Sequence, residues 1–164
     1  MADDMGWADP ACYGSKLNVT PNLDRLAKEG TRFTSFYATQ AVCTSSRCAL
    51  LSGCYPNRLG LGGTALPPKS KTGLSTTEES LATLLRKSGY HTGIVGKWHL
   101  GYVSEQAWPI QQGFDSFFGF LDQFLLRGPH TDAGYNLKRP TYVNPLLQRD
   151  NGAFEKHTGH LSDI

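Results

Sequence analysis

The sequence is short of the features that mark several classes of protein. Its 164 residues include only four cysteines, too few for the disulfide scaffold of a small secreted domain. No apolar run approaches the roughly 20 residues that a transmembrane helix needs. Sixteen basic and fourteen acidic residues leave a net charge of +2, which excludes a dedicated binder of nucleic acid or of a membrane surface. With 39% hydrophobic and 18% charged residues, the chain is not disordered either.

What the sequence does contain is a succession of short elements separated by glycine and proline. Thr20, Pro21 and Gly30 carry the cap, first-turn and stop signals of one helix. Thr76 and Glu79 form a capping-box pattern before another. The patterns predict helices over about 21–29, 46–52 and 77–88, strands over 31–38, 90–95 and 114–120, a surface loop over 59–77, and loops after residue 121.

This alternation of helices and apolar strands predicts an α/β fold with a largely parallel sheet. In such sheets ligands bind beyond the carboxyl ends of the strands. Two groups of polar residues, Asp3-Asp4 and Lys97 with His99, fall where predicted strands end. We therefore expect functional side chains at this edge of the sheet.

Asp3 and Asp4 are adjacent carboxylates near the start of the chain. Two such groups repel each other, so a buried pair requires a neighbouring cation. Their hard oxygen atoms suit calcium or magnesium. The alternative is a solvated acidic turn, and the residues alone leave both readings open.

Cys43 precedes a predicted short helix, and Arg47 follows four residues later on the same helical face. The exposed backbone N–H groups of a helix start attract an anion. Lys97 and His99 stand two apart, so on an extended chain both side chains point to one face, where they suit an oxyanion or a leaving group. The alternatives are a small buried cysteine with a surface arginine, and an exposed lysine with a partly buried histidine.

Taken in order, these segments resemble the sulfatase family. The run Cys43-Thr44-Ser45-Ser46-Arg47 through Gly53 is similar to the first sulfatase signature, and Gly89 through Gly101 to the second. The resemblance is dense from Ala2 to about Phe120. It also includes the segments 2–7, 12–14, 20–27, 30–33, 113–115 and 118–119.

The resemblance implies an alkaline-phosphatase-like α/β sandwich that hydrolyses a sulfate ester. It implies that Cys43 is oxidised to formylglycine, whose hydrated aldehyde attacks sulfur. It assigns Asp3, Asp4 and Cys43 to a calcium site, with magnesium as the alternative ion. It makes Arg47 a partner of the nucleophile, gives Lys97 and His99 contacts with the sulfate, and gives His99 proton transfer.

The same resemblance implies a formylglycine-generating enzyme as maturation partner and a small-molecule or glycan sulfate ester as substrate. It also implies an exported location, periplasmic, lysosomal or secreted.

The sequence departs from the family pattern in two respects. Ser45 occupies the position where the family usually has proline, and family chains are much longer. We therefore expect residues 1–164 to be the N-terminal part of one catalytic domain, truncated at both ends. The alternatives are a phosphodiester or phosphonate monoester hydrolase of the same superfamily, and an inactive fragment.

Overall fold

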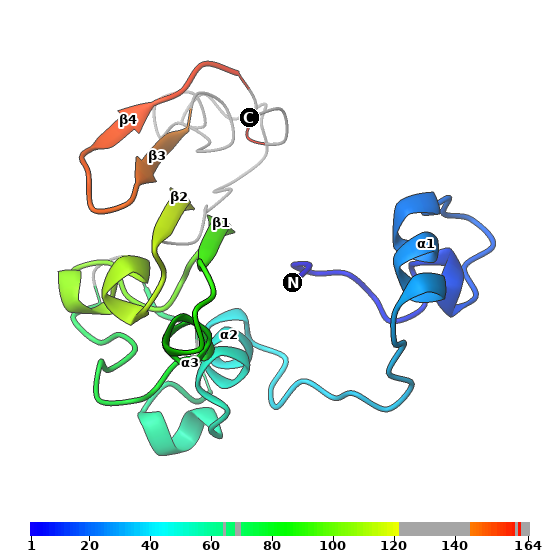
Figure 1. The fold of residues 1–164 in the computed structure, drawn as a ribbon, viewed down its shortest axis with the longest axis horizontal. Helices are drawn as coiled ribbons and strands as arrows, with labels where there is room; N and C mark the ends of the chain where they lie inside the picture. Colours follow the sequence, from blue (N-terminus) through cyan, green and yellow to red (C-terminus); the bar gives the residue numbers. More distant parts are fainter. Residues whose placement is uncertain (64, 68–69, 122–144, 160, 162–164) are drawn as a thin grey trace, which may run out of the picture. The chain divides into compact units, whose positions relative to one another are not determined.

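The computed structural model describes residues 1–63, 65–67, 70–121, 145–159 and 161 (Figure 1). They divide into two compact units, the first spanning Met1–Tyr37 and the second Ala38–Ile164. Each unit is described by itself. Among the described residues, no helix has the length and apolar character required to cross a membrane.

The first unit is built around helix α1 (Pro21–Glu29), preceded by a short 3-10 turn, η1 (Ala11–Tyr13). The predicted helix and its first-turn proline are confirmed. Thr20 is the N-cap residue of α1 as predicted, but it makes no side-chain capping bond to this helix. Its Oγ1 accepts from the Ala11 backbone N–H at 2.8 Å and donates to Asp24 Oδ1 at 3.1 Å. The Thr20 hydroxyl therefore joins the two helical segments of this unit.

The predicted strand over 31–38 is wrong. The backbone there forms bends and extended coil with no strand pairing. Phe33, Phe36 and Tyr37 are 65%, 71% and 83% exposed. Thr, Phe and Tyr favour strands because they pack well on a pleated sheet, and this preference has no effect where no neighbouring strand pairs with the segment.

The second unit begins with α2 (Cys43–Ser52), followed by η2 (Pro56–Leu59) and α3 (Leu81–Lys87). Helix α2 ends at Gly53 as predicted, with φ of 66°, but it starts at Cys43 rather than Ser46. Helix α3 is shorter than predicted because Ser80 caps it. The Ser80 Oγ accepts from Thr83 N at 3.0 Å, so the Thr76 capping box is not used.

A four-stranded sheet in the order β1-β2-β3-β4 completes this unit (Figure 1). Strands β1 (Gly93–Lys97) and β2 (Ser116–Phe120) are parallel, with Gly96 opposite Gly119. The predicted strands at 90–95 and 114–120 are thus confirmed with shifted ends. Strands β3 (Leu146–Arg149) and β4 (Phe154–Lys156) pair antiparallel, which corrects the prediction of loops for this part of the chain. The predicted loops over 122–144 lie outside the described residues. The two short turns η3 (Glu105–Ala107) and η4 (Pro109–Gln112) lie between β1 and β2 in the sequence.

The core of the second unit lies between α2, α3 and the sheet. Its buried residues include two from the segment 59–77, Leu61 and Leu74, which are 2% and 3% exposed. The prediction of a surface loop there is therefore wrong in part. It rested on the glycine and proline content of the segment, although the segment also contributes two buried leucines to the core. The remaining core residues are Cys48, Ala82, Trp98, Leu100, Phe114, Phe117 and Leu121.

Asp115 joins the starts of β1 and β2. Its Oδ2 accepts from the Thr92 backbone N–H at 2.8 Å and from Thr92 Oγ1 at 3.0 Å. His91 and Arg86 lie at 3.7 Å and 4.0 Å from its carboxylate oxygens. The two hydrogen bonds from Thr92 lower the pKa of Asp115, and the charges of His91 and Arg86 lower it further.

We expect this carboxylate to make stability depend on acid pH. Because the folded-state pKa of Asp115 is lowered, its contribution is complete above the unfolded pKa, near 4, and is lost as pH falls through the folded pKa. The gap in urea midpoint between the parent and Asp115→Asn should therefore shrink on acidification from about pH 5. Glu105→Gln, at an exposed position, is the control. A gap that stays constant with pH would contradict the assignment.

Candidate active site

Helix α2 presents its N-terminus through Cys43, its first residue. Val42, the residue before it, is extended with φ of −84° and ψ of 136°, and makes no side-chain capping bond. The first backbone N–H groups of a helix have no partner within the helix. In α2, Ser46 N is the first to bond back, to Val42 O at 2.8 Å. The half-buried Cys43 side chain therefore sits at a helix start that suits an anion.

Strand β1 brings Lys97 and His99 to its carboxyl end. Lys97 is the last residue of the strand, and the two following N–H groups still bond to the β2 side, Trp98 N to Phe120 O at 2.9 Å and His99 N to Leu121 O at 3.0 Å. His99 is 1% exposed and has φ of 61°. The alternation that predicted a shared face does not extend to His99, because the strand ends at Lys97.

Two side chains of α2 bind the backbone at this strand end. Arg47 donates from a terminal guanidinium nitrogen to the carbonyl of Lys97 at 2.6 Å. The buried Thr44 donates from Oγ1 to the carbonyl of His99 at 3.1 Å. These contacts join residues that are 50 and 55 positions apart in the sequence. The structure thus brings the N-terminal half of α2, which contains Cys43 and Arg47, to the backbone of Lys97 and His99.

Leu66 closes a ring of contacts behind this region. Its backbone N–H donates to Thr44 Oγ1 at 3.0 Å, and its carbonyl lies 3.0 Å from His99 Nε2. Because a carbonyl can only accept, Nε2 carries the hydrogen in this contact, and Nδ1 is the basic nitrogen of the neutral ring. The backbone at Leu66 therefore sets both the orientation and the tautomer of His99.

Ser45 fixes the first turn of α2 to a second loop. Its side chain is fully buried, and its Oγ donates to the carbonyl of Leu61 at 2.6 Å. A proline side chain has no donor for this carbonyl. The serine that departs from the sulfatase signature therefore has a structural role of its own in this chain.

Asp3 and Asp4 belong to the first unit, where they occupy an exposed bend. Asp4 has φ of 57°, a conformation that aspartate tolerates better than most residues. Among the residues that the structure describes, no three His, Cys, Asp or Glu side chains gather into a metal-binding group. The two carboxylates are suitable ligands for a hard cation, but they supply only part of a coordination shell.

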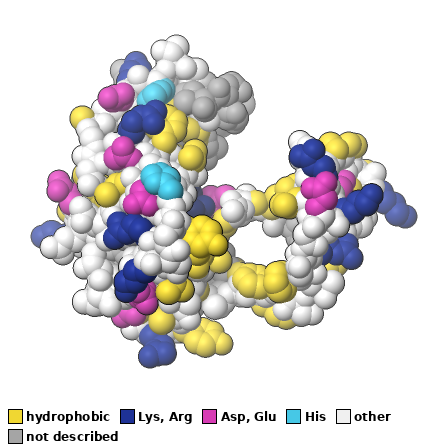
Figure 2. Space-filling view, in the orientation of Figure 1, with side chains coloured by type: hydrophobic (Ala, Val, Ile, Leu, Met, Phe, Trp, Pro, Cys, Tyr) yellow, Lys and Arg dark blue, Asp and Glu magenta, His cyan; other side chains and the backbone are white. Residues whose placement is uncertain are grey.

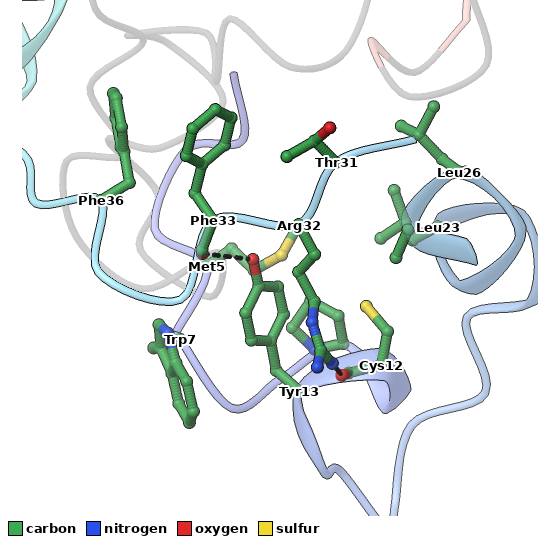
Figure 3. Close-up of a pocket in the computed structure, with 12 residues that line it drawn as sticks. Met5, Trp7, Cys12, Tyr13, Leu23, Leu26, Thr31, Arg32, Phe33 and Phe36 are labelled. Carbon is green, nitrogen blue, oxygen red and sulfur yellow. Dashed lines mark hydrogen bonds between the residues drawn. The ribbon is translucent and has the colours of Figure 1, made fainter. Parts of the chain in front are cut away.

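The first unit also contains a hollow of about 400 Å³ (Figure 3). Trp7, Phe33 and Phe36 line it, together with Tyr13, whose hydroxyl donates to Phe33 O at 3.2 Å. Arg32 is the cation among its lining residues, and its guanidinium donates to the Cys12 carbonyl. This hollow is mainly apolar, so it does not reproduce the anion-binding character of the α2 start.

Charge on the visible face of the second unit is mixed. Figure 2 shows basic and acidic side chains interspersed over it rather than separated by sign.

Thr44, Ser45 and Leu66 are site residues that no sequence motif predicted. Their contacts with His99 and with Leu61 are hydrogen bonds between residues far apart in the sequence. The spacing of residues within a short segment does not predict such bonds. One signal could have indicated a role for Thr44 and Ser45, because both directly follow the candidate nucleophile Cys43 in the sequence.

Fold and site together define an α/β protein in which a helix start meets the end of a parallel strand. The chain belongs to the sulfatase family, whose family model matches residues 1–158. Arylsulfatase A of Homo sapiens is 49% identical over 119 residues, which cover 72% of this chain and 24% of that protein. Steryl-sulfatase of Mus musculus is 44% identical over 129 residues, or 73% of this chain and 21% of that protein.

Solved structures of similar proteins confirm the predicted alkaline-phosphatase-like α/β fold. Ps i-CgsB matches with a TM-score of 0.80 and 35% identity, over 98% of this chain and 37% of that one. The PsFucS1 sulfatase from Pseudoalteromonas sp. matches with a TM-score of 0.70 and 36% identity, over 97% of this chain and 34% of that one. The chain thus spans about a quarter of the curated relatives and a third of these structures.

Proposed function

We propose that the protein hydrolyses sulfate esters as an arylsulfatase-type enzyme. The observation that carries this proposal is the junction of α2 and β1, where Arg47 and Thr44 of the helix bind the carbonyls of Lys97 and His99. This junction supports the proposal because it brings the helix that begins at Cys43 and carries Arg47 to the backbone of Lys97 and His99. Membership of a family of sulfuric ester hydrolases supports the same reaction.

Cys43 is the proposed site of conversion to formylglycine. Its place as first residue of α2, half-buried at a helix start, suits a group that carries negative charge during the reaction. When present, formylglycine supplies a hydrated aldehyde as the nucleophile, and it releases sulfate without a second attack on sulfur.

The other proposed roles belong to side chains of this chain. Lys97 binds the sulfate group through its ammonium. Arg47 offsets negative charge beside Cys43, with one guanidinium N–H anchored on Lys97 O at 2.6 Å. His99 holds or transfers a proton at Nδ1, since the contact with Leu66 O places the hydrogen on Nε2.

Asp3 and Asp4 are the proposed ligands of a divalent cation, calcium with magnesium as the alternative. Adjacent carboxylates are the hard donors that calcium prefers. The cation would supply a positive charge that favours the ionised nucleophile and the bound sulfate. The assignment of Cys43 as a further ligand stays a prediction.

Maturation would involve a formylglycine-generating enzyme that reads the segment around Cys43 in extended form. In the folded chain this segment is helical, and Ser45 is fully buried on Leu61. We therefore propose that conversion precedes folding of α2. An exported location, periplasmic, lysosomal or secreted, is part of the same proposal, and the sulfated substrate is a small molecule or a glycan.

Mass spectrometry of a tryptic digest tests the proposal. Cleavage after Arg32 and Arg47 releases residues 33–47, in which Cys43 is the single cysteine. In a host that has the maturation enzyme, we expect this peptide to carry an aldehyde that reacts with a hydrazide. The peptide over 48–58 holds Cys48 and Cys54, is outside the motif and should remain free of aldehyde.

A peptide 33–47 with an unmodified thiol in that host would contradict the formylglycine assignment. With the aldehyde present, we expect the protein to hydrolyse an aryl sulfate faster than an aryl phosphodiester. The reverse preference would favour the phosphodiester or phosphonate monoester hydrolase, since the same nucleophile can attack phosphorus.

A further inference from the structure

Of two cysteines that the proposed function does not use, one lies within α2 and the other just beyond its C-terminal end. Cys48 is fully buried in the last turns of the helix, and Cys54 is half-buried just beyond it. Gly53 stands between the helix and Cys54 with φ of 66°, and its N–H bonds to Ala49 O at 2.9 Å. A left-handed glycine at a helix end turns the chain back, so that the residue after it contacts the last turns of the helix.

The hydroxyl of Ser52 ties the two cysteines together. Its Oγ donates to the Cys48 carbonyl at 2.7 Å and accepts from the Cys54 backbone N–H at 3.2 Å. A single hydroxyl group therefore bridges the backbones of Cys48 and Cys54. Burial raises the pKa of the Cys48 thiol, and the neighbouring Cys54 raises it further, which agrees with two thiols close to each other.

We propose that Cys48 and Cys54 form a disulfide, by thiol–disulfide exchange with a small disulfide such as oxidised glutathione. It would join the C-terminal turn of α2 to the segment after it, at the opposite end of the helix from Cys43. The site is a dithiol that a small oxidised thiol compound can modify, and it is independent of the proposed sulfatase reaction.

The exchange has two steps whose order follows from exposure. The Cys54 thiolate, the more accessible one, attacks one sulfur of the small disulfide and expels a glutathione thiolate, leaving a mixed disulfide. The Cys48 thiolate then attacks the Cys54 sulfur, forms the internal S–S bond and expels the second glutathione thiolate. Two protons pass from the protein thiols to the leaving thiolates, and two electrons reduce one disulfide to two thiols.

The test is thiol trapping after equilibration of the chain in glutathione redox buffers. We expect the tryptic peptide 48–58 to lose two hydrogens and to take up no alkylating reagent. Cys12, in peptide 1–16, reports non-specific oxidation. A synthetic peptide 48–58 gives the unfolded reference, and the oxidised-to-reduced ratio in the folded chain should exceed it by about tenfold or more.

Two single variants separate the partners. Cys48→Ser should leave Cys54 as a stable mixed disulfide with glutathione, because the resolving thiol is gone. Cys54→Ser should leave Cys48 unmodified in the folded chain, because it is buried. A folded chain whose ratio equals that of the synthetic peptide, or whose two cysteines each carry glutathione, would overturn the proposal.

Discussion

Replacing Gly119 with alanine is expected to break the parallel pairing of β1 and β2. A Cβ atom at Gly119 would lie 2.0 Å from the backbone oxygen of Gly96 and 2.8 Å from its carbonyl carbon. These are main-chain atoms directly opposite in the register, so the strands must separate to admit it. We expect Gly119→Ala to lose about 4 kcal/mol or more, a large part of a typical total of about 5–15 kcal/mol.

Gly93→Ala is the matched control, since Gly93 lies in β1 of the same strand pair. There the added Cβ would meet a single side-chain atom, the Ser116 hydroxyl at 3.0 Å, which can rotate away. We expect a loss below about 1 kcal/mol for this variant. Urea unfolding, monitored by circular dichroism, measures the free energy of unfolding of both variants. Equal midpoints for the two variants would show that the pairing at Gly96 is not as close as described.

Thr44→Val is expected to disturb the site while keeping its shape. Valine has nearly the same volume as threonine but leaves the His99 carbonyl without its donor and the Leu66 N–H without its acceptor. Each buried group that loses its partner costs about 1–3 kcal/mol. Since Leu66 also orients His99, the proposed sulfate ester hydrolysis should slow by about 100-fold in kcat, with KM less affected.

Thr44→Ser separates the hydroxyl from the methyl group. It keeps both hydrogen bonds and loses one methyl, worth about 1 kcal/mol, so kcat should stay close to that of the parent protein. The formylglycine content of peptide 33–47 is measured for every variant, and turnover is expressed per aldehyde. Equal losses in Thr44→Ser and Thr44→Val would assign the effect to packing and refute the positioning role.

The local parts of the fold were predictable because local chemistry determines them. Pro21 at a helix start and Gly53 in the left-handed conformation at a helix end follow from single-residue preferences. The segment 31–38 was predicted wrongly because strand formation depends on a partner that the segment itself does not contain. The β3–β4 hairpin was missed for the same reason, since its short strands have little pattern of their own.

For the site, the sequence motifs could be predicted, whereas the long-range contacts between them could not. The residues themselves, Cys43, Arg47, Lys97 and His99, stay a prediction from local motifs. The α/β pattern placed only Lys97 and His99 at a strand end, and β1 does end at Lys97. The ring through Thr44, Leu66 and His99 was not predictable, because a hydroxyl that binds a carbonyl 55 residues away leaves no periodic trace in a sequence.

Two hydrogen bonds that hold α2 against the end of β1 end on main-chain atoms. Arg47 and Thr44 bind the carbonyls of residues 97 and 99, and neither contact uses the side chain found there. Any amino acid supplies the same carbonyl. These two hydrogen bonds are thus distinct from the side chains proposed to act on the sulfate group. A substitution at position 97 changes the chemistry offered to a substrate and leaves the carbonyl that anchors Arg47 in place.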